Sequence, residues 1–452
     1  MRDLDNIRKL YFLGIGGIGM SALARYFYAK GVEIKGYDKT PTSLTRQLES
    51  EGMDVHYEDD PSRIDPDTDM VIFTPAVPLE LNEFNHIVRL GFPLKKRAEV
   101  LGMITAGKRV IAVAGTHGKT SVSSLIAHLL KEAGIPVIAL IGGISKNYGT
   151  NFIAGEGADP IFVVEADEFD RSFLSLNPDV AVVSSMDADH LDIYTTHGAL
   201  EDSFRQFAGR IKKGGILVAK SGLDLNPSAG SRKITYGLEG NEEITAGMIR
   251  VSGGKHSFEI IRMGKTVGML SLGIPGRHNI ENALAAYAVS REIGIAPDKL
   301  LHGLSTYQGV NRRFDIRVKL QDKVYIDDYA HHPRELQAFI SAVREILPGR
   351  KITGIFQPHL YSRTRDFAEG FARSLDLLDE VFLMDIYPAR EEPLEGVSSA
   401  MILSRMKCPM KAIASREEII RKIESTKPEI LLTMGAGDID QLVPVIEKIY
   451  NG

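Results

Sequence analysis

The sequence is poor in cysteine and in long apolar runs, and each shortage excludes a class of protein. Its 452 residues contain a single cysteine, Cys408, so no disulfide can form within the chain. We interpret Cys408 as structural, because no neighbouring residue marks a reactive thiol. No apolar run approaches the roughly 18 residues of a membrane-spanning helix, and the first residues lack the apolar core of a secretion signal. A cytoplasmic protein without a membrane partner is expected.

Positive charge is not in excess either. The chain has 54 lysines and arginines against 59 aspartates and glutamates, which leaves a net charge of −5. Nucleic-acid-binding proteins present an excess of positive charge, so no nucleic-acid partner is expected. The hydrophobic content of 44% and charged content of 25% are typical of globular proteins. At roughly 150 residues per domain, the length predicts about three domains, in a monomer or a homodimer.

Strand-like apolar runs alternate with helical stretches along most of the chain, which is typical of α/β proteins. Examples are the runs at 9–13, 110–114, 161–164 and 180–183. Because several runs end in glycine or acidic residues, we expect the chemistry at the carboxyl ends of parallel strands.

The α/β pattern restarts at Leu10, Val110 and Val324. We therefore predict a Rossmann-like N-terminal domain over 1–107, a central P-loop ATPase-like domain over 108–309 and a Rossmann-like C-terminal domain over 310–452. Between 230 and 272 short alternating segments predict hairpins appended to the central domain.

A glycine-rich turn, 14–19 (GIGGIG), follows the first predicted strand and precedes a helix predicted over 20–30. Its backbone N–H groups and the helix N-terminus can hold a diphosphate. Asp38, at the end of the next strand, can accept a hydrogen bond from a ribose hydroxyl. The motif alone predicts a dinucleotide or a nucleotide sugar, or only a tight turn chosen for packing.

A second loop, 115–120 (GTHGKT), follows the buried run 110–114 and opens a helix predicted over 121–133. Its glycines expose backbone N–H groups to phosphates, Lys119 supplies a cation and the Thr120 hydroxyl can bind Mg²⁺. ATP is the expected ligand. Only two residues separate the glycines, so the match to the common Walker pattern is partial.

Acidic residues and a histidine follow two further strands of the central domain. Glu165 ends one strand, while Asp187, Asp189 and His190 follow another. Taken together, they are suitable ligands for a hard cation beside phosphates. Since a simple dehydrogenase has no use for an ATP loop, the N-terminal domain is expected to hold a substrate.

Polar clusters also end the strands of the C-terminal domain, at 327–333 (DDYAHHP), 357–365 (QPHLYSRTR) and 435–438 (GAGD). Basic groups there suit a carboxylate or a transferring phosphate, although a solvent-facing charged loop is the alternative. Upstream, Asn279 and Asn282 are three residues apart, which places both amides on one face of a helix.

Together these motifs make the sequence similar to the Mur ligases over essentially its whole length. The resemblance rests on 14–21 (GIGGIGMS), 74–77 (TPAV), 115–120 (GTHGKT), 165–168 (EADE), 189–192 (DHLD), 278–282 (HNIEN), 312–314 (RRF), 327–333, 357–365 and 435–438. It implies an ATP-dependent ligase of bacterial peptidoglycan synthesis. Such an enzyme would join L-alanine to the lactyl carboxylate of UDP-N-acetylmuramate through an acyl phosphate, giving UDP-N-acetylmuramoyl-L-alanine, ADP and phosphate.

The resemblance also implies a role for each domain and for individual residues. The N-terminal domain would bind the UDP-sugar, the central domain ATP and Mg²⁺ (Mn²⁺ as an alternative), and the C-terminal domain the amino acid. The catalytic residues would be Lys119, Glu165, His190, Arg313 and Asp328, and the metal ligands Thr120, Glu165 and His190. The ATP-binding residues would be Gly115, Thr116, His117, Gly118, Lys119, Thr120, Asn279, Asn282, Arg313 and Asp328. The UDP-sugar would contact Gly14, Gly16, Gly17, Ile18, Gly19, Met20, Ser21, Asp38, Thr74, Pro75 and Ala76, and the amino acid His331, His359 and Arg363.

The sequence departs from the family pattern at Leu360, where an arginine usually follows Gln-Pro-His. One expected contact to a carboxylate is then missing, and Arg363, Arg365 or Arg171 can replace it. Ligases of the family that add later residues carry a carbamylated lysine about 15 residues after the metal histidine. The segment 191–211 contains no lysine, which agrees with an L-alanine ligase.

Three alternatives remain. A recycling ligase that attaches a tripeptide to the same nucleotide sugar typically lacks GGIGMS and the QPH segment followed by RTR, both of which this chain has. A nicotinamide dehydrogenase would explain 14–38 but would leave Lys119 and Glu165 without a purpose. A non-catalytic protein with degenerate ligase domains would not need every charged residue that the chemistry requires.

Overall fold

The computed structural model describes residues 4–188, 194, 196–389 and 391–452. The architecture is α/β, with three domains that each contain a largely parallel sheet, and the chain forms two compact units. The first unit extends to Thr245 and includes Arg262–Lys265 and Asn282–Gly303. The second comprises Ala246–Ile261, Thr266–Glu281 and Leu304–Gly452.

The N-terminal domain alternates strands and helices, as its sequence pattern predicts. Its sheet has the parallel order β3-β2-β1-β4-β5. The elements are η1 (Leu4–Asn6), β1 (Lys9–Leu13), α1 (Ile18–Tyr28), β2 (Glu33–Tyr37), α2 (Ser43–Ser50), β3 (Asp54–His56), η2 (Pro61–Arg63), β4 (Met70–Phe73), α3 (Asn82–Leu90), β5 (Leu94–Lys96) and α4 (Arg97–Thr105).

The strand order reverses between β1 and β4, so the loops that follow these two neighbouring strands lie together at the carboxyl edge of the sheet. Ligands of open α/β sheets bind at such switch points. Gly14 follows β1 with a φ of +82°, and a Cβ added there would lie 2.9 Å from the Thr74 Cγ2 that follows β4. The glycine therefore allows the two loops to meet.

The central domain is built on a larger sheet. In the first unit its strand order is β12-β11-β10-β6-β9-β7-β8, parallel except for the β7/β8 pair. The elements are β6 (Val110–Ala114), α5 (Lys119–Glu132), β7 (Val137–Ser145), β8 (Thr150–Ala154), β9 (Ile161–Glu165), η3 (Phe169–Ser175), β10 (Val180–Val183), α7 (His197–Ala208), β11 (Ile216–Lys220) and β12 (Arg232–Gly237).

The segment 230–272, predicted to form hairpins, begins instead with β12, which pairs in parallel with β11 and β13 (Ile244–Ser252) as a strand of the central sheet. The rest of the segment holds the consecutive strands β13, β14 (Lys255–Arg262) and β15 (Lys265–Ser271), which are sheet neighbours in that order. Positive φ angles at Gly253, Gly254 and Gly264 make the tight turns between them. Helices α8 (Arg277–Glu292) and α9 (Pro297–Thr306) follow.

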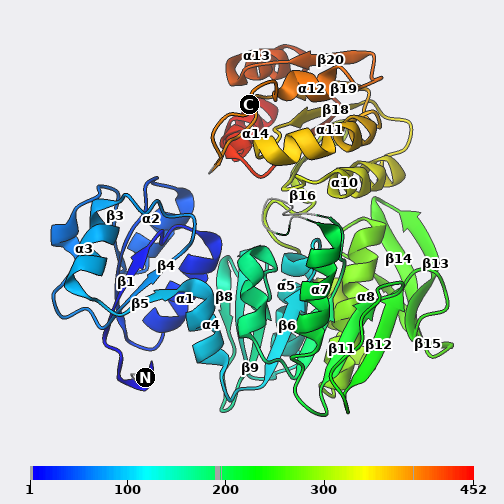
Figure 1. Cartoon of the computed structure of the whole chain (residues 1–452). Helices are drawn as coiled ribbons and strands as arrows, with labels where there is room; N and C mark the ends of the chain where they lie inside the picture. Colours follow the sequence, from blue (N-terminus) through cyan, green and yellow to red (C-terminus); the bar gives the residue numbers. More distant parts are fainter. Residues whose placement is uncertain (1–3, 189–193, 195, 390) are drawn as a thin grey trace. The chain divides into compact units, whose positions relative to one another are not determined.

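One apolar core joins the N-terminal and central sheets within the first unit. The buried cluster includes Met20, Leu23 and Tyr26 of α1 together with Leu140 of β7 and Phe162 of β9. Helix α1 accordingly packs on β7 and β8, and Figure 1 shows α1 and α4 between the two sheets. The domains that carry the two glycine-rich loops, 14–19 and 115–120, thus share a core.

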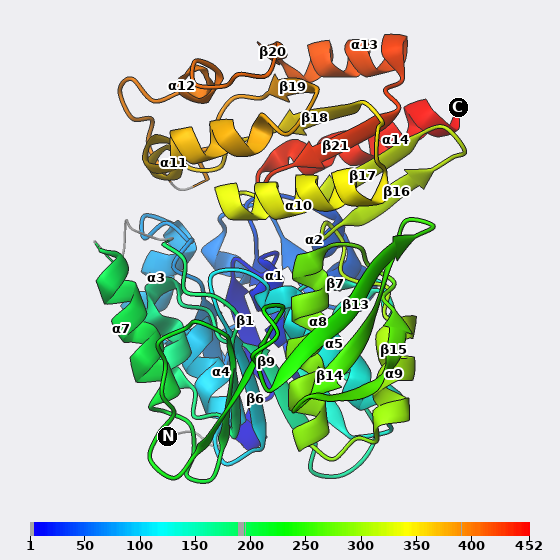
Figure 2. The same cartoon turned by 90° about the vertical axis from the view of Figure 1, so that its right-hand side faces the viewer.

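The C-terminal domain has the strand order β16-β17-β21-β18-β19-β20, in which only the β16/β17 pair is antiparallel. Helices α10 and α11 lie side by side on one face, and α13 and α14 pack together on the other (Figure 2). The elements are β16 (Asp315–Lys319), β17 (Val324–Asp328), α10 (Pro333–Ile346), β18 (Ile352–Phe356), α11 (Tyr361–Leu375), β19 (Glu380–Leu383), α12 (Ser399–Leu403), β20 (Met410–Ile413), α13 (Arg416–Thr426), β21 (Ile430–Met434), η4 (Asp438–Leu442) and α14 (Val443–Asn451).

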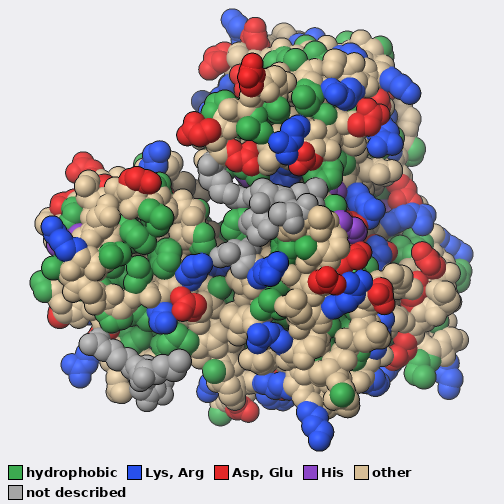
Figure 3. All heavy atoms as spheres, in the orientation of Figure 1, with side chains coloured by type: hydrophobic (Ala, Val, Ile, Leu, Met, Phe, Trp, Pro, Cys, Tyr) green, Lys and Arg blue, Asp and Glu red, His purple; other side chains and the backbone are tan. Residues whose placement is uncertain are grey.

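The surface agrees with the small net charge. On the face shown in Figure 3, acidic and basic side chains are interspersed. Among the residues that the structure describes, no helix combines the length and apolar character needed to cross a bilayer. Cys408 is buried and its Sγ lies 3.5 Å from the Leu378 carbonyl oxygen.

Candidate active site

The loop that follows β6, predicted to bind phosphate, is compact. Gly115 has a φ of +132°, and a Cβ added there would lie 2.2 Å from the Ser184 Oγ, so only glycine fits. Gly118 has a φ of +85° and precedes the first residue of helix α5. Between them, the His117 N–H donates to Ser185 Oγ at 2.9 Å and the Thr116 hydroxyl to the Asp187 carbonyl at 3.0 Å. The predicted loop thus stands at a helix N-terminus, where anions bind.

Lys119 of this loop is held by a buried carboxylate. Its Nζ lies 2.8 Å from both carboxylate oxygens of Glu168 and donates to the Gly115 carbonyl at 2.8 Å. The Glu168 side chain is only 1% exposed. Burial by itself lowers the pKa of Lys119, but the carboxylates of Glu168, Asp167 and Glu165 outweigh it, so the pKa is raised. The ammonium is therefore charged and stands in the phosphate loop.

Thr120 and Glu165, two predicted metal ligands, are neighbours. The Thr120 Oγ1 donates to a Glu165 carboxylate oxygen at 3.1 Å, and the Ser123 hydroxyl and the Gly142 N–H also donate to this carboxylate, at 3.2 Å and 2.5 Å. Burial raises the pKa of Glu165, although the Gly142 N–H and Lys119 oppose that shift.

The predicted metal ligand His190, with Asp189, lies outside the described residues. Within the described ranges, no three His, Cys, Asp or Glu side chains gather as a ready-made metal site. Thr120 and Glu165 nevertheless offer a hydroxyl and a carboxylate oxygen, which are donors that Mg²⁺ accepts.

Asn279 and Asn282 lie in the first turns of helix α8 and are both buried. In the second unit, the Asn279 Nδ2 donates to the Pro275 carbonyl at 2.6 Å. In the first unit, a Cβ on Gly118 would lie 2.8 Å from the Asn282 Oδ1. The Asn282 amide oxygen therefore lies beside Gly118 of the loop.

The predicted UDP-sugar residues of the N-terminal domain form two groups at the carboxyl edge of its sheet. Gly14, Gly16, Gly17, Ile18 and Gly19 form the turn after β1 and the start of α1, while Thr74, Pro75 and Ala76 follow β4. One oxygen of Asp38 accepts from the Gly16 N–H at 2.8 Å and the other from the Thr40 N–H at 3.1 Å, so this carboxylate stabilises the glycine turn. Met20 and Ser21 are buried, and the Ser21 hydroxyl donates to the Ile18 carbonyl at 3.0 Å.

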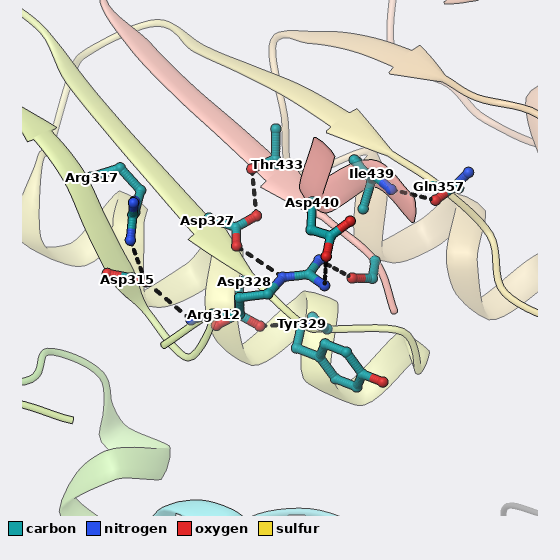
Figure 4. Close-up of polar contacts among 12 residues, drawn as sticks. Arg312, Asp315, Arg317, Asp327, Asp328, Tyr329, Gln357, Thr433, Ile439 and Asp440 are labelled. Atoms are coloured by element: carbon teal, nitrogen blue, oxygen red, sulfur yellow. Dashed lines mark hydrogen bonds and ion pairs between the residues drawn. The ribbon is translucent and has the colours of Figure 1, made fainter. Parts of the chain in front are cut away.

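Arg313 lies in a strained turn of the C-terminal domain that its neighbours hold in place. Arg312 and Phe314, on either side of it, have φ values of +61° and +47°, which cost energy in residues other than glycine. Arg312 Nε donates to Asp327 at 3.0 Å and Nη2 to the Gly435 carbonyl at 2.7 Å (Figure 4). This salt bridge to the buried Asp327 and the bond to Gly435 stabilise the turn that contains Arg313.

Asp328 completes this turn. Its two oxygens accept the Phe314 N–H at 2.7 Å and the Ala330 N–H at 2.8 Å. Burial raises the pKa of Asp328 to about 7, although the Arg313 guanidinium acts in the opposite direction. In Figure 4 Asp328 lies on the strand beside Asp327, close to Tyr329. The Arg313 guanidinium is 5.1 Å from the centre of the Tyr329 ring.

The predicted amino-acid residues form one cluster in the second unit. The rings of His331 and His359 are 6.1 Å apart, and Arg363 Nη1 lies 3.3 Å from His359 Nδ1. Arg363 is only 5% exposed, whereas Arg365 is exposed and pairs with the adjacent Asp366. Of the arginines proposed to replace the one missing at 360, Arg363 is therefore the one beside the histidines.

Sequence reasoning gave no site role to three residues that the structure ties to the site. Glu168 holds Lys119, Arg312 supports the turn of Arg313, and Asn151 contacts the start of helix α1. Glu168 and Arg312 stand inside motifs and could have been examined as partners of their neighbours. Asn151 has no such signal.

Each of the three domains is similar in sequence to a known protein family. Three family models match the chain, described as the Mur ligase family, catalytic domain (residues 9–109), the Mur ligase middle domain (113–290) and the Mur ligase, glutamate ligase domain (312–437). A UDP-N-acetylmuramate--L-alanine ligase of Flavobacterium johnsoniae is 46% identical over 99% of both chains. One of Parabacteroides distasonis is 47% identical over 99% of this chain and 98% of the other.

The chain is also similar to solved structures of ligases over nearly its whole length. The UDP-N-acetylmuramate-alanine ligase MurC of Thermotoga maritima matches with a TM-score of 0.83 and 27% identity, over 98% of this chain and 99% of the other. A murein peptide ligase of Psychrobacter arcticus shares the fold, with a TM-score of 0.72 at 21% identity over 97% and 98%. With its motifs, fold and full-length relatives in agreement, this chain belongs to the Mur ligase family.

Proposed function

We propose that this enzyme joins L-alanine to the lactyl carboxylate of UDP-N-acetylmuramate at the expense of ATP. The observation that carries the proposal is the phosphate loop with its buried Lys119–Glu168 pair, in a chain whose full-length relatives are named for this reaction. The glycine-rich turn of the N-terminal domain, at the start of helix α1, would supply the second anion site that a UDP-sugar needs. The domain boundaries near 107 and 310 are part of this proposal.

In the proposed reaction the lactyl carboxylate attacks the γ-phosphorus of ATP, and ADP leaves. The acyl phosphate formed is an activated carbonyl. The amine of L-alanine attacks that carbonyl, loses a proton, and the tetrahedral intermediate expels phosphate to leave an amide. Lys119 offsets negative charge on the transferring group, and Arg313 and Asp328 of the C-terminal domain contact the nucleotide.

The residues around the phosphate loop fit a magnesium ion. Thr120 and Glu165 present oxygen donors beside the loop, 3.1 Å from each other. With His190 as a third ligand, they would hold Mg²⁺, which would neutralise phosphate charge when bound. Lys119 and the N–H groups of the loop orient the phosphates.

The cluster of His331, His359 and Arg363 is the proposed site of the alanine carboxylate. The buried Arg363 is a suitable donor to a carboxylate because its guanidinium offers a planar fork. It would replace the arginine that the family pattern has at the position of Leu360.

An acceptor panel tests the proposal. Purified enzyme receives ATP, Mg²⁺ and UDP-N-acetylmuramate with L-alanine, with the recycling tripeptide or with no acceptor, and released phosphate is measured. Release that depends on L-alanine supports the proposal. Release only with the tripeptide assigns the enzyme to recycling, and release with neither overturns both assignments.

A further inference from the structure

A polar network with a buried centre and one exposed end, at Glu51, crosses the apolar junction between the N-terminal and central domains of the first unit. Its centre is Asn151 of β8, which is 0% exposed. The Asn151 Nδ2 donates to the Ile18 carbonyl at 2.7 Å and to the Ser21 hydroxyl at 2.9 Å. Both partners lie in the first turn of α1, which begins within the glycine-rich segment 14–19.

The network continues from α1 to α2. The Asn151 Oδ1 accepts a hydrogen bond from Arg25 Nη1. Arg25, only 5% exposed, also forms a two-pronged salt bridge with Glu51, with Nε 2.8 Å from one oxygen and Nη2 2.7 Å from the other. Glu51 is the C-cap residue of α2, so one asparagine of the central sheet reaches two helices of the N-terminal domain.

The surroundings of this network are apolar. Tyr26 of α1 meets Phe152 and Phe162 of the central sheet edge to face, with ring centres 6.3 Å and 6.1 Å apart. Apolar packing is non-directional, so it tolerates small shifts of one domain against the other. A hydrogen-bond network inside that packing is satisfied at only one relative position of the two domains. Every side-chain hydrogen-bonding atom of Asn151 is used.

We infer that Asn151 is a positioning residue, which fixes the glycine-rich loop relative to the ATP loop. The inference rests on the proposed function, in which the carboxylate of a sugar nucleotide held by the first loop attacks a phosphate held by the second. A misplacement of about 1 Å between reacting groups costs about 100-fold in rate. Each nucleotide, in contrast, would contact only its own loop. Its affinity should therefore not depend on the position of one loop relative to the other.

The test is the Asn151→Leu variant of the full chain, which removes all three hydrogen bonds at similar side-chain volume. The expected result is a kcat lowered 10- to 100-fold, while the Kd of ADP and the Kd of UDP-N-acetylmuramate, each measured alone by calorimetry, stay within about threefold of the parent values. Ile234→Ala is the control, because it opens a cavity at a buried position of β12, away from the junction. It is expected to lower Tm and to leave kcat unchanged.

Circular dichroism first establishes that the variant is folded. If Asn151→Leu does not fold, Asn151→Ser, which keeps one donor, takes its place with the same expectation. An unchanged kcat in a folded variant overturns the inference, and so does a loss of affinity that accounts for the whole loss of rate. A parent enzyme without activity toward L-alanine defeats the proposed function instead.

Discussion

Substituting Lys119 by methionine separates its contribution to stability from its contribution to catalysis. The variant keeps an apolar stem but removes the ammonium that lies 2.8 Å from both carboxylate oxygens of Glu168. Because the Glu168 side chain is only 1% exposed, the substitution leaves a buried carboxylate without its cation. Breaking a buried ion pair in this way costs about 3–5 kcal/mol, which lowers the Tm of a unit of this size by roughly 10 °C.

The loss of stability in Lys119→Met depends on pH. The pKa of the unpaired, buried Glu168 carboxyl will lie above its value in the unfolded chain, about 4.3. The folded variant then holds a proton that the unfolded chain releases, so its stability falls as the pH rises. The Tm difference from the parent enzyme is therefore expected to be smaller at pH 5 than at pH 8.

The double variant Lys119→Met/Glu168→Gln provides the control. It removes both charges, so most of the lost stability should return, while phosphate release stays absent because the Lys119 ammonium no longer offsets charge on the γ-phosphate. Scanning calorimetry and a phosphate-release assay measure the two properties. A Lys119→Met protein as stable as the parent, or an active double variant, would refute the reasoning.

Three further predictions follow from the site. Burial raises the pKa of Asp328 to about 7. The ionisation of Asp328 therefore lowers the stability of the folded chain as the pH rises from about 4 to 7. Asp328→Asn should flatten the dependence of Tm on pH over that range, and an unchanged slope contradicts this. Gly115→Ala should abolish ATP binding, because its Cβ would lie 2.2 Å from a serine hydroxyl. Gly134→Ala is the control: Gly134 has a positive φ but nothing within 4 Å of the added Cβ, so this variant should lose about 1 kcal/mol of stability and keep activity. Calorimetric titration with ADP shows whether only the first variant loses nucleotide binding. Arg363→Met should raise the KM for L-alanine at least tenfold and the exposed Arg365→Met less than twofold, and equal effects would remove Arg363 from the alanine site.

Much of the fold was predictable because each buried strand is a short apolar run that can be recognised from its own sequence. The runs at 9–13, 110–114 and 180–183 are apolar, and they form β1, β6 and β10 with those bounds. The loops after β1 and β6 were predictable because glycine is needed where φ is positive, as at Gly14 and Gly115. These signals lie within a few residues of one another, so a single sequence carries them.

The parts that escaped prediction depend on residues far apart in the sequence. Asn151 meets Arg25 across 126 positions, and a lone asparagine in a strand has no spacing that marks its partner. The Lys119–Glu168 pair spans 49 positions. The union of two domains in one compact unit likewise follows from the apolar faces that they share, which local periodicity does not reveal.

The most direct test of the central claim follows the oxygen atoms of the lactyl carboxylate. UDP-N-acetylmuramate labelled with ¹⁸O in that carboxylate is incubated with enzyme, ATP, Mg²⁺ and L-alanine, and both products are analysed by mass spectrometry. Since phosphate leaves from an acyl phosphate, one label should appear in the released phosphate and one should remain in the new amide. Unlabelled phosphate, or a sugar nucleotide without an added alanyl group, would contradict the account.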